Sequence, residues 1–214
     1  MSDLTLYIET TPRFSEVALR GPGRERILKT EQATGNRDLV ALIRRLFEEE
    51  GAAPTDLAAV VIDVGPGALT SVRVGVAFGN ALAYGRSIPT RGYSSLDIIG
   101  FAASAQTGVP TVVAVRGPEG AAYVGLWCPE NGGRHWVLDA GDLAADHEVT
   151  RALQSGAKLA GPAAETLAVW CPDAQVIAGF EASSAQRLIA IDESDRFRAS
   201  PVAAQAPIVG ENFR

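Results

Sequence analysis

Apolar and polar positions alternate along this chain in patterns that predict short strands and amphipathic helices. In the first half, apolar runs between turn residues predict strands, and apolar residues at helical spacing predict helices. Gly21-Pro22-Gly23 separates the second and third strands and is typical of a hairpin turn. The predicted strands are at 4–9, 15–19, 26–32, 58–64 and 88–91, and the predicted helices are at 36–50, at 71–84 and from 96 onward.

The second half repeats the same order with weaker patterns. Its predicted strands are at 111–115, 122–127, 136–138, 158–160 and 176–178, and its predicted helices are at 142–153, 163–170 and 184–191. Each half therefore begins with the order β-β-β-α-β-α, and this repeated order places the chain in the α/β class and indicates a duplication. We expect two lobes, at 1–107 and 108–214, of which the second is smaller and more divergent.

Composition narrows the function classes. With 47% hydrophobic residues the chain can bury a substantial core, and its formal net charge of -6 repels polyanions, so a free-standing tRNA binder is not expected. The first residues lack the basic and apolar segments of a signal peptide, and no apolar run reaches the roughly 20 residues that a bilayer requires. A cytoplasmic location without membrane contact is the expectation.

Cysteine and histidine positions give little sign of a metal or redox site. Cys128 and Cys171 are far apart in sequence and are expected to be free, partly buried thiols. His135 and His147 fall in a predicted strand and a predicted helix, and we interpret them as surface or capping residues. We therefore expect no metal site and no cofactor.

The turn Gly65-Pro66-Gly67 joins a buried strand to a helix that is expected to start near Thr70. Backbone N–H groups at such a helix start can bind an anion. Alternatively the glycines only permit a sharp turn, with Thr70 or Ser71 as the N-cap. The loop lacks the Gly-Lys-Ser/Thr ending of a P-loop.

The helix at 71–84 is apolar around its whole circumference. Gly75, Gly79 and Ala83 form a smooth stripe along it, suited to close packing against the chain's own sheet or another helix. The helix predicted at 36–50 also has a wide apolar stripe. Asn36 is its predicted N-cap, and Gly51 is expected to end it. Two such helices on one sheet face would leave apolar surface exposed, which indicates a partner.

Three segments carry a resemblance to a known family. DVGPGALTSVRVGVAFGNALAYG (63–85) is similar to the GPGSFTGxRxGxxxAxGLA signature of the TsaB (YeaZ) family. LYIETTPRFSEVAL (6–19) resembles its opening LAIDTS......SVAL, and IPTRGYSSLDIIG (88–100) resembles its IPxxGVSSLxxxA segment. The resemblance implies two ribonuclease H-like lobes of the actin-like ATPase (ASKHA) superfamily, in a non-catalytic paralogue of the enzyme TsaD.

The resemblance also implies partners. In that family the two apolar helices bind TsaD, or a second copy when TsaD is absent, while TsaD transfers threonylcarbamoyl to the adenosine beside the anticodon of tRNA. A TsaE-like ATPase is a further implied partner, and tRNA is reached only through TsaD. A charge at Phe78 or Leu42 is expected to abolish pairing in a folded monomer. The predicted partner-binding residues are Leu39, Leu42, Ile43, Leu46, Val74, Gly75, Phe78, Gly79 and Leu82.

No catalytic residue is predicted. Glu9 falls where an ATPase of this superfamily carries its first acid, but Arg116 replaces the acid expected in the second lobe, and a cation there opposes Mg²⁺ binding. Ser71 and Asn80 also depart from the family signature. A vestigial nucleotide site is predicted at Glu9, Thr10, Gly65, Gly67 and Thr70.

Two other functions stay open. An ATP-dependent small-molecule kinase or ATPase of the same fold would use Glu9 and the Gly65-Pro66-Gly67 loop to handle phosphate. A homodimer with an unrelated regulatory role would use the same helices for self-association. Nucleotide binding that depends on Glu9 distinguishes the first of these from the non-catalytic subunit.

Overall fold

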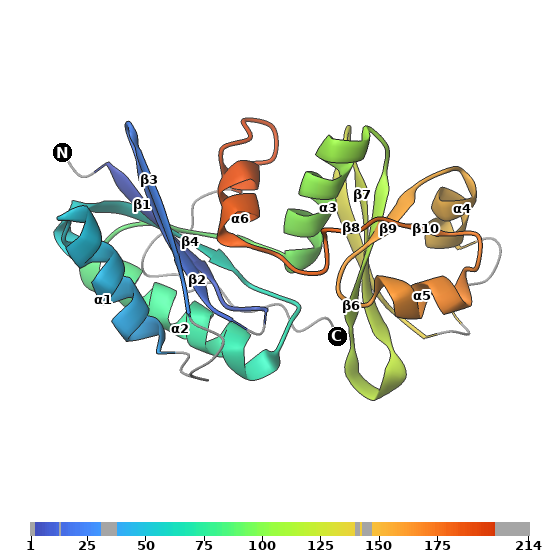
Figure 1. The fold of residues 1–214 in the computed structure, drawn as a ribbon, viewed down its shortest axis with the longest axis horizontal. Helices are drawn as coiled ribbons and strands as arrows, with labels where there is room; N and C mark the ends of the chain where they lie inside the picture. Colours follow the sequence, from blue (N-terminus) through green and yellow to red (C-terminus); the bar gives the residue numbers. More distant parts are fainter. Residues whose placement is uncertain (1–2, 13, 31–37, 140–141, 143–146, 200–214) are drawn as a thin grey trace. The chain divides into compact units, whose positions relative to one another are not determined.

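The chain folds into two compact units. The computed structural model describes residues 3–12, 14–30, 38–139, 142 and 147–199. The first unit holds the chain up to Ser94 and the segment that begins at Ser184, and the second unit runs from Ser95 to Ser183 (Figure 1). Each unit is built on one five-stranded sheet.

The first sheet mixes antiparallel and parallel pairing. Its strands are β1 (Leu4–Glu9), β2 (Glu16–Gly21), β3 (Arg24–Lys29), β4 (Leu57–Asp63) and β5 (Thr90–Tyr93), and their order is β3-β2-β1-β4-β5. β1, β2 and β3 form an antiparallel meander, whereas β4 runs parallel to β1 and β5 runs parallel to β4. The meander predicted from the turn at Gly21-Pro22-Gly23 is therefore confirmed.

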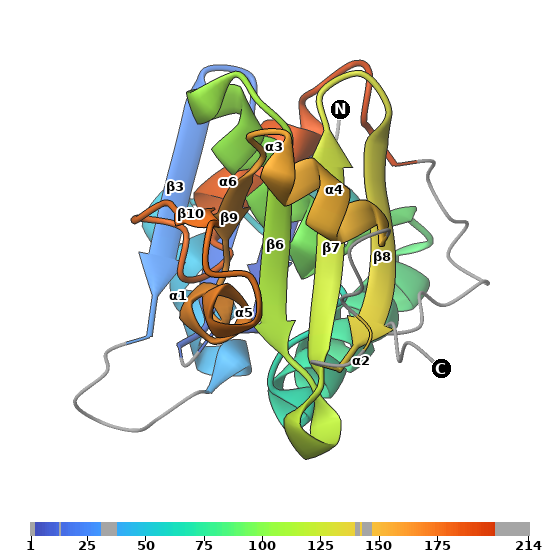
Figure 2. The ribbon, with the colours of Figure 1, turned by 90° about the vertical axis from the view of Figure 1, so that its right-hand side faces the viewer.

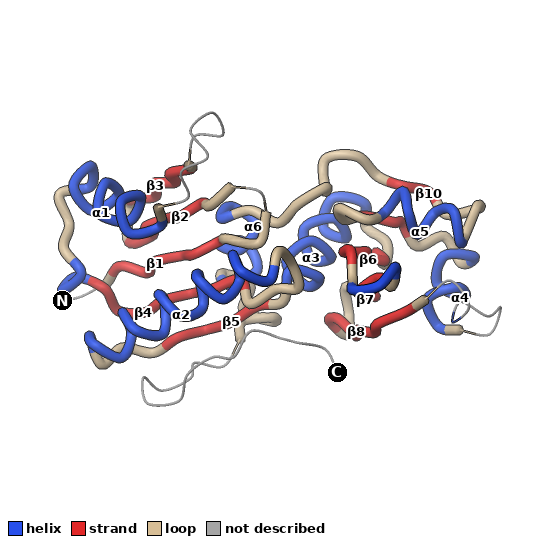
Figure 3. Tube along the Cα trace, turned by 90° about the horizontal axis from the view of Figure 1, so that it is seen from below, coloured by secondary structure: helices blue, strands red, loops and turns tan. Residues whose placement is uncertain are grey.

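Helices cover both faces of this sheet. α1 (Leu39–Glu50) and α2 (Leu69–Arg86) lie on one face, and α6 (Ala185–Asp192) lies on the other (Figures 1 and 3). Alternate residues of each strand point toward α1 and α2, where they form the main apolar core of the unit. This core includes Leu6, Ile8, Val17, Leu19, Val60 and Ile62 from the strands and Leu42, Leu46, Phe47 and Val76 from the helices.

The second sheet repeats the first on a smaller scale. Its strands are β6 (Thr111–Arg116), β7 (Ala122–Cys128), β8 (Gly132–Leu138), β9 (Lys158–Ala160) and β10 (Gln175–Val176). Read from β8 to β10, the order β8-β7-β6-β9-β10 matches that of the first sheet, with the same antiparallel and parallel pairings (Figure 2). α4 (Glu148–Gln154) and α5 (Ala164–Trp170) contact one face, and α3 (Ser95–Thr107) contacts the sheet through a separate cluster.

The two units exchange their third helices. α3 follows β5 in sequence but packs on β6, β7 and β8, whereas α6 follows β10 and packs on β1, β2 and β4. The division into units therefore differs from the expected boundary between residues 107 and 108. The α/β class and the duplicated, ribonuclease H-like architecture are confirmed.

Several predicted element ends were wrong by a few residues. α1 begins at Leu39 with Asp38 as its N-cap, and the predicted cap Asn36 lies outside the described residues. α2 begins at Leu69 after Ala68, so Thr70 and Ser71 lie within its first turn and do not cap it. α4 begins only at Glu148, because His147 takes the capping position. The described residues also include 3-10 turns at Pro54–Asp56 and Pro118–Gly120.

Candidate functional site

Two buried carboxylates lie where β1 and β4 end. Glu9 and Asp63 are both fully buried, and because their strands are neighbours and parallel, the two ends meet at one edge of the sheet. Thr11 joins them: its backbone N–H and its hydroxyl donate to Glu9 Oε1, at 2.8 and 2.6 Å, and its hydroxyl oxygen lies 3.2 Å from Asp63 Oδ2. Gly65 N–H donates to Asp63 Oδ1 at 2.8 Å. Local loop atoms thus satisfy several of the carboxylate lone pairs.

The loop after β1 is fastened to the start of α2. The Thr10 hydroxyl donates to the Ser71 carbonyl at 2.8 Å, and a side chain at Gly75 would collide with that hydroxyl. A Cβ at Gly67 would lie 2.7 Å from the Thr11 Cβ, so the two loops also touch there. Gly65 has a backbone φ of 97°, a conformation that residues with a side chain rarely adopt. These glycines allow close packing of one loop on the other.

The five residues of the predicted nucleotide site separate into two groups. Glu9, Thr10, Gly65 and Gly67 lie together at this sheet edge, whereas Thr70 is exposed in the first turn of α2. Asp63 and Thr11 complete the cluster and were not predicted as site residues. An acid ending an otherwise apolar strand was the available signal for Asp63. Thr11 donates to Glu9 through both its backbone N–H and its hydroxyl, so this inward carboxylate is bound by its own loop.

The predicted partner-binding residues do not share one exposed surface. On α1, all four are at most 6% exposed and belong to the core of the unit. On α2, Val74 is 49% exposed, and Phe78 and Leu82 are half-buried against the same core. The four α1 residues are Leu39, Leu42, Ile43 and Leu46.

The small-residue stripe of α2 is used inside the unit. A Cβ at Gly79 would lie 2.5 Å from Ile62 Cδ1 and 3.4 Å from Ile8 Cδ1, and Gly75 meets Thr10. Of the two alternatives for this stripe, packing against the chain's own sheet is therefore the one observed. The Leu42 side chain is only 6% exposed, so a charge there would be buried and is expected to destabilise the monomer as well as any pairing.

An apolar groove lies between α1 and α2. Its volume is about 260 Å³, and its lining includes the half-buried Phe78 and Leu82 of α2 and the exposed Val40 of α1. The side chains of Arg44 and Glu48 bring charge to it. Val40 is 59% exposed although its neighbour Leu39 is buried, so the outer side of α1 carries apolar surface beyond what the core uses.

The remaining candidates have structural surroundings. His147 Nδ1 accepts from Val149 N–H at 3.2 Å as the N-cap of α4, which confirms its capping role, and His135 Nε2 lies 2.8 Å from Asp97 Oδ1. Cys128 and Cys171 are free and partly buried, as expected, and burial raises the pKa of the Cys171 thiol. Within the described residues, no three His, Cys, Asp or Glu side chains gather in a way that could hold a metal ion. Arg116 is exposed at the end of β6.

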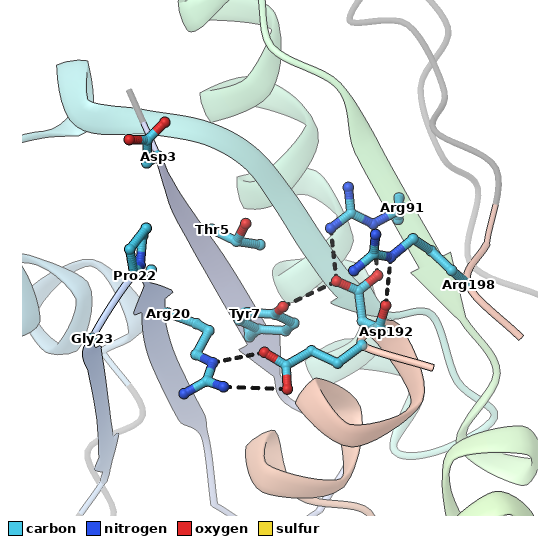
Figure 4. Close-up of a pocket in the computed structure, with 11 residues that line it drawn as sticks. Asp3, Thr5, Tyr7, Arg20, Pro22, Gly23, Arg91, Asp192 and Arg198 are labelled. Atoms are coloured by element: carbon cyan, nitrogen blue, oxygen red, sulfur yellow. Dashed lines mark hydrogen bonds and ion pairs between the residues drawn. The ribbon is translucent and has the colours of Figure 1, made fainter. Parts of the chain in front are cut away.

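A second polar cluster, centred on Asp192, fixes the end of α6 to the sheet (Figure 4). Asp192 is 1% exposed and accepts from Arg91 Nε and Nη2 at 2.6 and 2.7 Å, from Tyr93 Oη at 2.8 Å and from Tyr7 Oη at 3.0 Å. Burial alone would raise the pKa of Asp192, but the hydrogen bonds from Arg91 and the two tyrosines outweigh it and lower this pKa. Burial, together with Asp192, raises the pKa of both Tyr7 and Tyr93. No sequence pattern predicted this cluster.

The duplicated sheets, with helices on both faces, define an actin-like α/β protein built from ribonuclease H-like lobes. Comparison with known proteins agrees with this class. A family model described as "TsaD: tRNA N6-adenosine threonylcarbamoyltransferase" matches residues 34–132, a segment that contains α1 and α2. Among curated proteins, the chain is similar to the tRNA threonylcarbamoyladenosine biosynthesis protein TsaB of Bacillus subtilis, with 31% identity over 90 residues. That match spans 42% of this chain and 39% of the relative's length.

Solved structures match over nearly the whole chain. YeaZ from Pseudomonas aeruginosa has a TM-score of 0.75 at 20% identity, covering 96% of this chain and 99% of that one. A crystal structure described as an uncharacterized protein with similarity to peptidase YEAZ, from the same organism, has a TM-score of 0.74 at 22% identity and covers 98% of this chain and 100% of the other. The resemblance to the TsaB (YeaZ) family is therefore confirmed. Among the described residues, every helix is too short or too polar to span a bilayer.

Proposed function

We propose that this chain is a non-catalytic subunit that binds a TsaD-like enzyme and supports threonylcarbamoyladenosine formation in tRNA. The observation that carries the proposal is the apolar outer side of α1 and α2, with its groove and the exposed Val40 and Val74. Surface of this kind on a helix pair is favourable for docking a partner helix. The TsaD-like family match over the same helices supports the partner's identity.

In this proposal the nine predicted residues have two roles. Val74, Phe78 and Leu82 contact the partner directly, and Val40 joins them. The buried residues Leu39, Leu42, Ile43, Leu46, Gly75 and Gly79 hold the two helices on the sheet and so shape the surface from below. When the TsaD-like subunit is absent, the same surface pairs two copies of this chain. A TsaE-like ATPase and tRNA would reach the complex through the TsaD-like subunit.

Chemistry at the Glu9–Asp63 cluster is not required by this role. Thr11 and Gly65 donate to these carboxylates, which supports a structural function for them. The raised pKa of Cys171 disfavours a thiolate nucleophile, so a peptidase-like activity finds no support in this thiol.

Co-expression with the TsaD-like protein of the same genome tests the proposal. Val74→Asp places a charge on the outer side of α2 and is expected to abolish co-purification and the threonylcarbamoylation that depends on this chain. Val169→Asp is the matched control, because Val169 is 77% exposed on α5 of the other unit. Equal loss of binding in both variants, or none in Val74→Asp, would refute the use of this surface.

A second candidate is an ATP-dependent kinase or ATPase of the same fold. The observation in its favour is that two fully buried carboxylates, Glu9 and Asp63, share one hydroxyl beside a glycine-rich turn. Calorimetry with ATP and Mg²⁺ separates it from the subunit role. Micromolar binding that disappears in Glu9→Ala would support the kinase. If no heat of binding is measured, the kinase candidate is ruled out and the subunit role remains.

A further inference from the structure

A polar pocket lies in the first unit at the end of the sheet away from the Glu9–Asp63 cluster. It opens beside the start of β1, the Gly21-Pro22-Gly23 turn and the C-terminal end of α6 (Figure 4). Its volume is about 380 Å³, within the range of about 300–1,000 Å³ that is typical of small-molecule sites. Its lining includes Thr5, Arg20, Arg91, Asp192, Glu193 and Arg198.

Most of the acidic groups here are already paired. Asp192 is bound by Arg91, Tyr7 and Tyr93, and Glu193 is bound by Arg20 Nε and Nη2 at 2.7 and 3.3 Å. Neither carboxylate is therefore a counter-ion for a further cation. Asp3 lies at the opposite end of the pocket from Arg91 and Arg198 (Figure 4).

Arg198 supplies positive charge and has no carboxylate partner among the described residues. Its Nε donates to the Asp192 backbone carbonyl at 2.7 Å, which orients the guanidinium but does not neutralise it. Its two terminal nitrogens contact no acceptor among the described residues. The guanidinium groups of Arg91 and Arg198 lie next to each other above Asp192, where Arg91 binds the carboxylate and Arg198 binds the backbone carbonyl, so two like charges lie side by side (Figure 4). An oxyanion beside them would relieve this repulsion and accept charge-assisted hydrogen bonds.

We propose that this pocket binds a phosphate or carboxylate group of a small metabolite through Arg198 and Arg91. Arg198 Nη1 and Nη2 donate to the oxyanion, and the remaining nitrogen of Arg91, which does not bind Asp192, donates beside them. The Thr5 hydroxyl lies further along the pocket toward Asp3 and is available to a polar group on the rest of the ligand (Figure 4). The site is independent of the partner surface on α1 and α2.

Inorganic phosphate and acetate are the probes. Each is titrated into the isolated full-length protein by calorimetry at constant ionic strength, because salt alone screens exposed charges. Thermal unfolding is followed in parallel, since a ligand that binds the folded state raises the midpoint with concentration. We expect saturable binding of at least one probe and a weakening of about tenfold or more in Arg198→Ala, as for the loss of charged hydrogen bonds.

Two variants separate binding from stability. Arg198→Gln keeps an N–H donor for the Asp192 carbonyl but removes the charge, so it is expected to stay folded and still bind weakly. Arg196→Ala is the control: it removes an exposed arginine that stacks on Phe197, and the pocket lining does not include it. Phosphate binding alone would assign a phosphate ligand, and acetate binding alone a carboxylate. Unsaturable titrations with both probes, or equal affinity in Arg198→Gln and wild type, would overturn the proposal.

Discussion

The two faces of the first sheet are held by different forces. The face under α1 and α2 is covered by a large apolar core that includes Leu46 and Ile62, both fully buried. The face under α6 is held at both ends of the helix by carboxylates: Glu16 accepts from Ala185 N–H at 2.8 Å, and Asp192 binds Arg91 and two tyrosines. Apolar burial is strong but non-directional, whereas buried hydrogen bonds fix one position.

This difference suits the proposed roles of the two faces. α1 and α2 rely on burial for attachment, so their outer sides are free to carry apolar surface for a partner. α6 is short, with eight residues, and polar contacts fix its register on the strands. Removing a polar contact should therefore affect the α6 face more than removing apolar volume affects the α1–α2 face.

Asp192→Ala gives the largest expected effect. It leaves the Arg91 guanidinium, 14% exposed, without its carboxylate, and breaking such a pair costs about 3–5 kcal/mol of unfolding free energy. Urea denaturation measures the loss. Asp195→Ala, at an exposed position shortly after α6, should change stability by less than about 0.5 kcal/mol. If the two variants were equally stable, the network would not be what holds α6.

Leu46→Ala tests the apolar face. Leu46 is fully buried in α1, and truncating a buried leucine costs about 2–5 kcal/mol of unfolding free energy, depending on how far the core relaxes. Denaturant unfolding should show a lower midpoint with an unchanged slope. Val40→Ala, on the exposed side of the same helix, is the matched control, and a similar loss there would contradict the assignment of inner and outer sides.

The pH dependence of stability gives a smaller effect of known sign. The pKa of Asp192 is lowered in the folded state, so the unfolded chain binds its proton more readily. The stabilisation is therefore present above the ordinary aspartate pKa of about 3.9 and is lost as the pH falls through the folded value. Between pH 5 and 3 the wild type should lose more unfolding free energy than Asp192→Asn. Parallel curves for the two proteins would show that this carboxylate does not contribute.

Many strands of the two sheets could be predicted from the sequence, because period-two alternation and continuous apolar runs are detectable even in short strands. β9 was predicted with its observed bounds, and β1 likewise. Helix starts were less predictable: α2 begins after Ala68, which has no capping side chain to mark the position. The inner and outer sides of α1 also could not be separated, since Leu39 and Val40 are both apolar and only tertiary packing buries one of them.

The site was predicted in part. The glycine-rich turn and Glu9 were visible as local sequence features, and Asp63 interrupted an apolar run. The Asp192 cluster was not predictable, because Tyr7, Arg91 and Asp192 are brought together only by the exchange of third helices between the units. No local pattern reports a hydrogen bond between residues 185 positions apart.

The exchange of α3 and α6 has a consequence for synthesis on the ribosome. All strands of the first sheet have been synthesised once Tyr93 has been made. One face of this sheet stays uncovered until α6 is synthesised, nearly a hundred residues later. A nascent chain that stops before Ser184 would expose Tyr7, Arg91 and Tyr93 to solvent or to chaperones. The first unit therefore reaches its final form only after the second unit has been translated. A fully covered first sheet requires that the chain has been synthesised through α6.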